Sequence, residues 1–377
     1  MEVAMTVLAS DYQARLIAVR AAMRTRGLEA LIVYSWKRGQ VRYLTGYRPN
    51  YIANVAAALL PLVGDATLFI RFPFDLERAR RACWFDDVRA SGDVPGIGRD
   101  IVDWLKAHGL AEAKVGLGAG DMVMDEWPHS LHQQIAAALP HLQFDDARDL
   151  LMALREVKSS AELDCLRASA RVTDLAIAAA RDRIRPGITE SQIVAEAEHT
   201  ARGAAAEEWL VAITTRGSRD LVHTPGAGAA ESGEVVVLEV ATQVGGYWTQ
   251  AARTFAVGEV SAAQQKIFAA THAAYRAAVE AAQVGRSLCD IQSSVNSILS
   301  PAGFMEYAEH DTGHGIGLDL PEPPRVDIEG DAQIKPGLVL VLHPAVRVPG
   351  VGGAFLGGTI LVTEHGPEPL HFIPETL

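Results

Sequence analysis

HDTGHGIGLDLPEPP, residues 310–324, is the stretch around which the rest of this chain is organised. It contains two histidines, three glycines and four side chains that end in a carboxyl or hydroxyl group. A strand or helix with a purely structural role has little need of such a composition, whereas a functional site does. From these residues alone, the alternative is a glycine-rich turn whose histidines fill the core.

The overall composition is that of a globular protein. The chain has 377 residues, of which 49% are hydrophobic and 21% charged, and this length favours two domains. The formal net charge is −12 and no block of Lys and Arg stands out, so nothing indicates binding to nucleic acid or to an anionic membrane surface. We therefore expect a small molecule or a peptide as the partner.

Cysteine usage and the N-terminus indicate the compartment. The three cysteines are scattered and lack CxxC spacing, which argues against a disulfide framework or a thiolate zinc site. The first ten residues carry no basic region followed by an apolar run, and no apolar stretch reaches the length of about 18 residues that a membrane helix needs. We expect a cytoplasmic protein without a membrane span.

Residues 1–155 are predicted to form an α/β domain. Apolar residues at helical spacing predict an amphipathic helix over 11–26, which Gly27 ends. Strands and helices then alternate, as in α/β domains. The expected strands are 30–34, 55–63, 66–70 and 114–117, and the expected helices are 101–108, 129–138 and 147–155.

Residues 156–377 are predicted to form a second domain. Ser159 with Glu162, and Thr189 with Gln192, have the spacing of capping boxes at the starts of two helices. Residues 235–240 read as a buried strand, and a turn at Gly245-Gly246 predicts a hairpin with 247–257.

Glu239 interrupts that buried strand with a carboxylate. A charged side chain in such a position costs several kcal/mol unless it is paired, hydrogen-bonded or bound to a ligand. Glu239 is therefore a candidate functional residue on physical grounds, with a structural ion pair as the alternative.

Ordered landmarks along most of the chain resemble those of the creatinase, prolidase and methionine aminopeptidase family. They are Val41 to Tyr47, Glu156 to Ser159, Leu166-Arg167, Gly246-Tyr247, Arg253 to Phe255, Gly313 to Gly317 and Thr359 to Glu364. The resemblance implies an α/β creatinase/prolidase N-terminal-like domain followed by an α+β pita-bread C-terminal domain. It does not by itself assign the chemistry.

In metallopeptidases of this family, five residues hold two metal ions. The resemblance places Glu239 and Gln250 at the two aspartate positions, His314 at the histidine position, and His343 and Gly357 at the two glutamate positions. Only His314 is unchanged, so we expect a divergent member that needs no metal cofactor. Losing carboxylates is consistent with a cation-free pocket, because close carboxylates raise one another's pKa.

We accordingly expect a metal-independent enzyme that hydrolyses a C–N bond in a small polar nitrogen compound, as creatinase does. The expected catalytic residues are His223, Glu239, His314 and His343. The expected substrate-binding residues are Gln250, Trp248, Arg253, Glu322, Arg48 and Tyr51. By analogy with creatinase, a homodimer is expected in which N-terminal residues such as Arg48 and Tyr51 contribute across the interface.

Three alternatives stay open at this point. The same pocket would suit a lyase, cyclase or isomerase, because several histidines can transfer protons. Glu239, His314 and His343 together form a two-histidine, one-carboxylate set that can hold one Fe, Zn or Mn ion. A non-catalytic binding protein with a peptidase-like fold is the third.

Overall fold

The computed structural model describes residues 9–36, 39–49, 52, 55–119, 127–309, 311–327 and 331–377. The chain divides into two compact units, one of which is Thr6–Arg155 while the other includes Glu156–Leu377. Each unit has its own sheet and its own hydrophobic core. None of the helices in these described ranges is long and apolar enough to cross a membrane.

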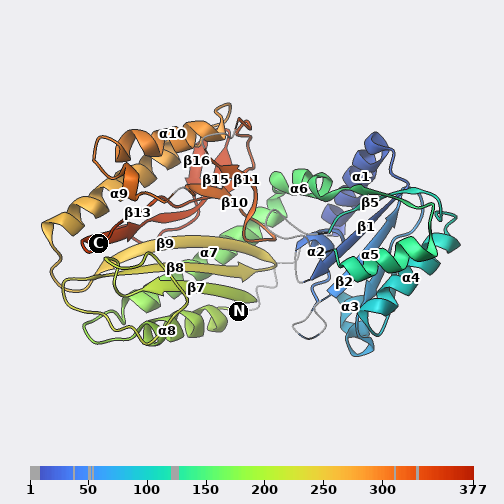
Figure 1. The fold of residues 1–377 in the computed structure, drawn as a ribbon, viewed down its shortest axis with the longest axis horizontal. Helices are drawn as coiled ribbons and strands as arrows, with labels where there is room; N and C mark the ends of the chain where they lie inside the picture. The colour runs from blue at the N-terminus through green and yellow to red at the C-terminus, as the bar shows by residue number, and fades with distance from the viewer. Residues whose placement is uncertain are drawn as a thin grey trace. The chain divides into compact units, whose positions relative to one another are not determined.

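The first unit is built on a six-stranded sheet in the order β4-β3-β2-β1-β5-β6 (Figure 1). Its strands are β1 (Ala30–Trp36), β2 (Val55–Pro61), β3 (Thr67–Ile70), β4 (Asp87–Ala90), β5 (Lys114–Leu117) and β6 (Gln143–Asp146). Its helices are α1 (Ala9–Arg26), α2 (Gly39–Thr45), α3 (Leu76–Ala82), α4 (Val94–Ala107), α5 (His129–Ala138) and α6 (Arg148–Glu156). Helices α4 and α5 bury their apolar residues against β1, β2 and β5.

Helix α4 begins earlier than the apolar spacing of 101–108 predicts. The Asp93 side chain accepts a hydrogen bond from Gly96 N, and a proline occupies the first turn. Both features favour a helix start, so the boundary is set by capping rather than by apolar periodicity.

The second unit is built on an eight-stranded antiparallel sheet in the order β11-β10-β12-β15-β9-β8-β7, with β16 paired to β15. Its strands are β7 (Glu208–Thr214), β8 (Val235–Val244), β9 (Tyr247–Ala256), β10 (Gly313–Gly315), β11 (Glu322–Val326), β12 (Val339–Leu342), β15 (Gly357–Thr363) and β16 (Gly366–Pro369). A separate pair is formed by β13 (Ala345–Val348) and β14 (Gly352–Phe355). The helices are α7 (Ser160–Arg181), α8 (Glu190–Gly203), α9 (Ala262–Ala281) and α10 (Leu288–Leu299).

Helices α7 and α8 pack against β8 and β9, and α9 and α10 pack against the strands later in the chain (Figure 1). The capping boxes expected at Ser159 with Glu162 and at Thr189 with Gln192 are confirmed at the starts of α7 and α8. Each box fixes the residue at which its helix begins, because it satisfies backbone N–H groups that the helix leaves without partners.

Alternation along β8 decides which face carries the site. One set of its side chains packs in the core with α7 and α8, namely Val236, Leu238 and Val240. Val235 and Val237 pack on the opposite face with Ala252 and Phe355. Since successive side chains of a strand point to opposite faces, Glu239 lies on this second face, away from the two helices.

The C-terminal segment is held by buried polar contacts around His371. The ring Nδ1 of His371 lies 2.9 Å from Asp174 Oδ1, and Phe372 N donates to Asp174 Oδ2. Burial lowers the pKa of His371, and its Nε2 has no hydrogen-bond partner among the described residues. A second proton on the ring would therefore leave a buried N–H unpaired, which is costly.

The free energy of unfolding is expected to fall as the pH drops below about 6.5, the ordinary pKa of histidine. In that range the unfolded chain binds a proton at His371 that the folded chain does not, which costs about 1.4 kcal/mol per pH unit for each such histidine. H371N keeps an amide that can donate to Asp174. Its free energy of unfolding, measured in urea at several pH values, should depend less steeply on pH than that of the wild-type protein. The same pH dependence of the unfolding free energy in H371N and in the wild-type protein would contradict this account.

Candidate functional site

Glu239 meets a polar partner from the neighbouring strand. It stands opposite Ala252 of β9, and Gln250, two residues earlier on β9, donates from Nε2 to Glu239 Oε1. Burial raises the pKa of Glu239 to about 7, and the hydrogen bond from Gln250 acts in the opposite direction. The Glu239 carboxyl group can therefore gain or lose a proton near neutral pH.

His314 and His343 are brought together in the same sheet. His314 is the middle residue of β10, while His343 follows β12 and donates from its backbone N to Thr312 O at 2.8 Å. The two rings lie edge to face with centroids 5.3 Å apart. Burial lowers the pKa of both histidines, that of His343 to about 4, so both rings are neutral at neutral pH.

The tautomer of His314 follows from its hydrogen bond. Its Nδ1 lies 2.8 Å from Gly315 O, and a carbonyl oxygen can only accept, so Nδ1 carries the proton. The other nitrogen, Nε2, then keeps its lone pair for a ligand or a proton.

Asp311 completes the group, although it is not among the site residues expected from the sequence. Its side chain is exposed and accepts from Gly313 N at 3.2 Å. Burial is the largest influence on the pKa values of Glu239, His314 and His343, and the Asp311 charge adds a smaller effect that raises all three. Its position two residues before the Gly-His-Gly of β10 was the signal available in the sequence. We call Glu239, Gln250, Asp311, His314 and His343 the Glu239 cluster.

Gly357 leaves no room for a side chain beside this cluster. Glu239, Ala252 and Gly357 stand in one row across β8, β9 and β15. A Cβ atom on Gly357 would lie 2.5 Å from Leu342 O and 2.6 Å from His343 Cβ. No ligand can come from this position unless the backbone moves, and Gln250 offers only a neutral amide. The two-ion centre that the family resemblance implies does not fit these residues.

The side chains of Glu239, His314 and His343 have the chemistry to bind a single metal ion. A carboxylate on Glu239 and two neutral imidazoles form a two-histidine, one-carboxylate set. As the side chains stand, no three or more His, Cys, Asp or Glu residues in the described ranges converge closely enough to hold a metal. Gln250 donates to Glu239 Oε1, which leaves Glu239 Oε2 for an ion.

His223 lies outside the Glu239 cluster. Its backbone pairs with Ile213 of β7, its Nδ1 is 2.8 Å from Thr224 O, and its Nε2 is 3.4 Å from Glu190 Oε1. The His223 side chain is 40% exposed. The structure thus places this expected catalytic residue on a loop beside α8 and gives it a carboxylate partner that was not anticipated.

Arg253 and Glu322, expected to bind substrate, are engaged inside the protein. Arg253 donates from all three guanidinium nitrogens to backbone carbonyl oxygens, those of Ala252, Gly357, Ile373 and Pro374. Glu322 accepts from Asp319 N and lies 3.3 Å from Lys158 Nζ, in an ion pair with side chains only 1% and 3% exposed. We therefore assign both residues to holding the fold around the site.

The other expected substrate-binding residues are placed as follows. Trp248 is half-buried on β9, and its backbone N donates to Gly317 O at 2.7 Å. Arg48 belongs to the first unit, where its carbonyl oxygen accepts from Arg78 Nη2. Tyr51 and His310 lie outside the described residues.

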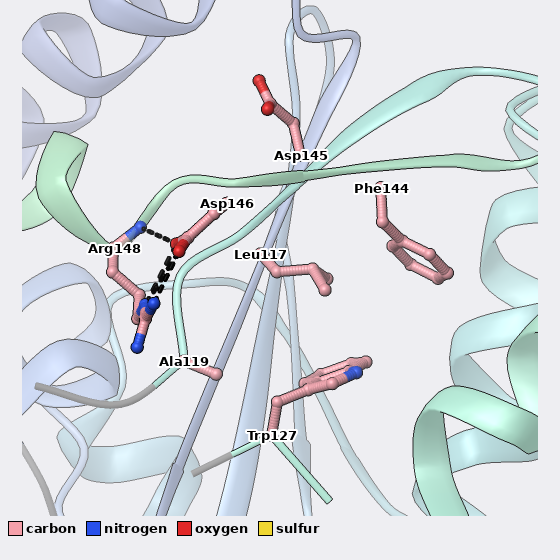
Figure 2. Close-up of a pocket in the computed structure, with 7 residues that line it drawn as sticks. All are labelled: Leu117, Ala119, Trp127, Phe144, Asp145, Asp146 and Arg148. Atoms are coloured by element: carbon pink, nitrogen blue, oxygen red, sulfur yellow. Dashed lines mark hydrogen bonds and ion pairs between the residues drawn. The ribbon is translucent and has the colours of Figure 1, made fainter. Parts of the chain in front are cut away.

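The first unit contains a separate cavity of about 200 Å³ at the ends of β5 and β6 (Figure 2). Trp127 and Phe144 form an apolar wall, and Asp145, Asp146 and Arg148 line its polar part. The charged groups already pair, Asp146 with Arg148 at 2.6 Å and Asp145 with Lys114 at 3.0 Å. Because its charges are satisfied, this cavity is not the candidate site.

Comparison with known proteins supplies a second line of argument. Residues 164–364 match the model of metallopeptidase family M24, and residues 15–157 match the creatinase/prolidase N-terminal domain. The chain is 28% identical to the probable dipeptidase PepE of Mycobacterium tuberculosis, over 98% of this chain and 96% of the relative. It is 29% identical to the Xaa-Pro dipeptidase of Pyrococcus furiosus, over 60% of this chain and 66% of the relative.

Solved structures agree with these matches. The dipeptidase PepE from Mycobacterium ulcerans is 27% identical, with a TM-score of 0.83 and coverage of 99% of this chain and 98% of that chain. The prolidase from Pyrococcus horikoshii OT3 is 23% identical, with a TM-score of 0.84 and coverage of 97% and 99%, and this likeness concerns the fold alone.

These matches confirm the expected fold, an α/β N-terminal domain followed by a pita-bread domain. They also correct the expected chemistry. The predictions of a metal-independent, creatinase-like enzyme that is not a peptidase, and of no cofactor, are wrong, because the matched family consists of metallopeptidases and the relatives are named dipeptidases. The main prediction relied on counting the ligand positions that the resemblance assigned, whereas the one-ion alternative on Glu239, His314 and His343 agrees better with the matched family.

Replacing Gly357 by alanine should lower the free energy of unfolding by about 1–3 kcal/mol, because the added methyl group overlaps backbone atoms of the segment that carries His343. Gly203, at the end of α8, has nothing within 4 Å of an added Cβ atom and is the matched control. G203A should leave stability unchanged or raise it slightly. Chemical denaturation of both variants measures the difference, and a G357A protein as stable as G203A would show that position 357 can accept a side chain.

Removing the charge of Lys158 should cost about 3–5 kcal/mol of unfolding free energy in K158M, because the buried Glu322 carboxylate loses its cation. The control is K335M, which removes the lysine of the Lys335–Glu156 pair, whose lysine side chain is 57% exposed. Exposed pairs contribute about 0–1 kcal/mol. Similar midpoints and slopes for the two variants in urea would mean that the buried pair contributes little.

Proposed function

Because the chain belongs to metallopeptidase family M24, we propose that it hydrolyses the amide C–N bond of small peptides, with dipeptides as the substrate class. The names of its relatives, probable dipeptidase PepE and Xaa-Pro dipeptidase, support this substrate class. The observation that carries the proposal is the Glu239 cluster. It gathers one carboxyl group with a pKa of about 7 and two neutral imidazoles beside a second carboxylate.

The residues that would hold a metal are Glu239, His314 and His343. Both imidazoles are neutral at neutral pH, and the Nδ1 hydrogen bond of His314 leaves its Nε2 lone pair available. When bound, a divalent ion polarises a carbonyl group and lowers the pKa of a coordinated water. The support for one ion rather than two is the crowding at Gly357 and the neutral amide of Gln250.

The other polar residues have separate roles in this proposal. Gln250 orients the Glu239 carboxylate through its Nε2 donor. Asp311 is exposed and is the carboxylate of the cluster that is not assigned to the metal. Half-buried Trp248 supplies an apolar surface on β9.

His223 is kept as a residue that contacts the substrate. Its backbone pairs with Ile213, which stands opposite Leu238, the neighbour of Glu239. At about 4.8 Å between strands, the His223 backbone lies roughly 10 Å from that of Leu238. An extended dipeptide, at about 3.5 Å per residue plus its side chains, is of comparable length.

Protein purified without added metal should contain about one divalent ion per chain and should hydrolyse dipeptides, with activity lost on chelation and restored by the metal. H314A and H343A should lose the ion, and E239A should lose at least about a hundredfold in kcat/KM. Q250A is the control, because an amide that only orients Glu239 can be removed with the ion retained.

Elemental analysis and a dipeptide panel measure these quantities. Two ions per chain, or full turnover after exhaustive chelation, would contradict the single-ion proposal. A protein that binds dipeptides without cleaving any of them would contradict the proposed hydrolysis.

A further inference from the structure

Glu190 is a buried carboxylate that the proposed mechanism does not use. It is the first residue of α8, and its side chain is 4% exposed. Its Oε1 accepts from Thr215 N at 3.1 Å and from Thr215 Oγ1 at 3.3 Å, while its Oε2 accepts from Gly226 N at 3.0 Å. The N-terminal end of a helix also favours a negative charge at this position.

These contacts hold the loop that carries His223 in place at positions before and after that residue. Thr215 precedes His223 and Gly226 follows it, and both backbone N–H groups donate to the same carboxylate. The backbone of α8 adds to this anchor, since Glu190 N donates to Gly228 O at 2.9 Å and Ser191 N donates to Gly226 O at 3.1 Å. The position of His223 therefore depends on Glu190 even before the ring is considered.

The ring of His223 is also in contact with Glu190. Its Nε2 lies 3.4 Å from Glu190 Oε1, and its Nδ1 lies 2.8 Å from Thr224 O. Each ring nitrogen thus faces an oxygen that can accept a hydrogen bond, which fixes the plane of the ring. The side chain remains 40% exposed, so a face of the ring stays accessible to a bound molecule.

We propose that Glu190 is a positioning residue that holds the His223 ring in the orientation in which it meets the substrate, an inference that rests on the proposed peptide hydrolysis. Glu190 itself does not touch the substrate, because its carboxylate is buried and faces the loop. A carboxylate that lies against one nitrogen of an imidazole in this way fixes the orientation of the ring, and therefore which face of it a bound molecule can reach. The assignment explains why a carboxylate with three other hydrogen bonds also lies against a half-exposed histidine.

A double-mutant cycle of E190Q and H223A tests this assignment. E190Q alone should lower kcat/KM by about 10- to 100-fold, the range found when a residue that orients a catalytic group is removed. The double variant should be no slower than H223A, within about twofold, because Glu190 has nothing left to position. Independent losses that multiply would show that Glu190 has only a structural role and would overturn the proposal.

Glu162 offers a matched control. It is likewise a buried carboxylate in the first turn of a helix, and it accepts from Ser159 N and Tyr247 Oη. E162Q should lower the melting temperature as E190Q does, but its effect on kcat/KM should multiply with that of H223A. If E190Q does not fold, E190D keeps the charge at a shorter reach and takes its place in the cycle.

A second cycle needs no substrate. It compares the equilibrium constants for unfolding of E190Q, H223A and the double variant with that of the wild-type protein. The effect of the double variant should differ from the product of the two single effects by about threefold or more. Additive effects would overturn the contact between them. If the coupling is present but the wild-type protein cleaves no dipeptide, the proposed function fails while the positioning of the ring by Glu190 stands.

Discussion

Burial of a carboxyl group on the face of β8 that points away from α7 and α8 is the constraint on which the candidate site depends. The alternation of β8 sends three aliphatic side chains into the core beneath α7 and α8, and this leaves Glu239 on the other face. Removing a carboxylate from water is costly, and the raised pKa of about 7 is the direct result. Gln250 offsets part of this cost with a hydrogen bond, so the two residues act as a unit.

The rest of the cluster is adjusted to that one carboxyl group. His343 and His314 are neutral because burial lowers their pKa values, so they add no charge that would draw a proton from Glu239. Gly357 provides space for the segment that carries His343, since any Cβ atom there would overlap Leu342 O. Gln250, His343 and Gly357 are therefore compatible with one another in charge and in volume.

Membership of a metallopeptidase family is compatible with the donor set of the Glu239 cluster. The chain is 28% and 29% identical to two named dipeptidases, so most aligned positions differ in residue type. Fold and family establish where chemistry takes place, and the residues at that place establish which chemistry is possible. Here the residues proposed to hold a metal are Glu239, His314 and His343, a donor set that suits one ion.

Local features of this protein were determined by the sequence alone. The capping boxes at Ser159 and Thr189, the hairpin at Gly245-Gly246 and the alternation that turns Glu239 away from α7 and α8 depend on residues only a few positions apart. Tertiary structure decided the pairings between distant segments, such as Lys158 with Glu322, Glu190 with His223, and Asp311 with the three groups whose pKa values it raises. Those pairings depend on which segments the sheet brings side by side. Spacing along the chain specifies helices and turns, but the electrostatics of a site depends on distances through space.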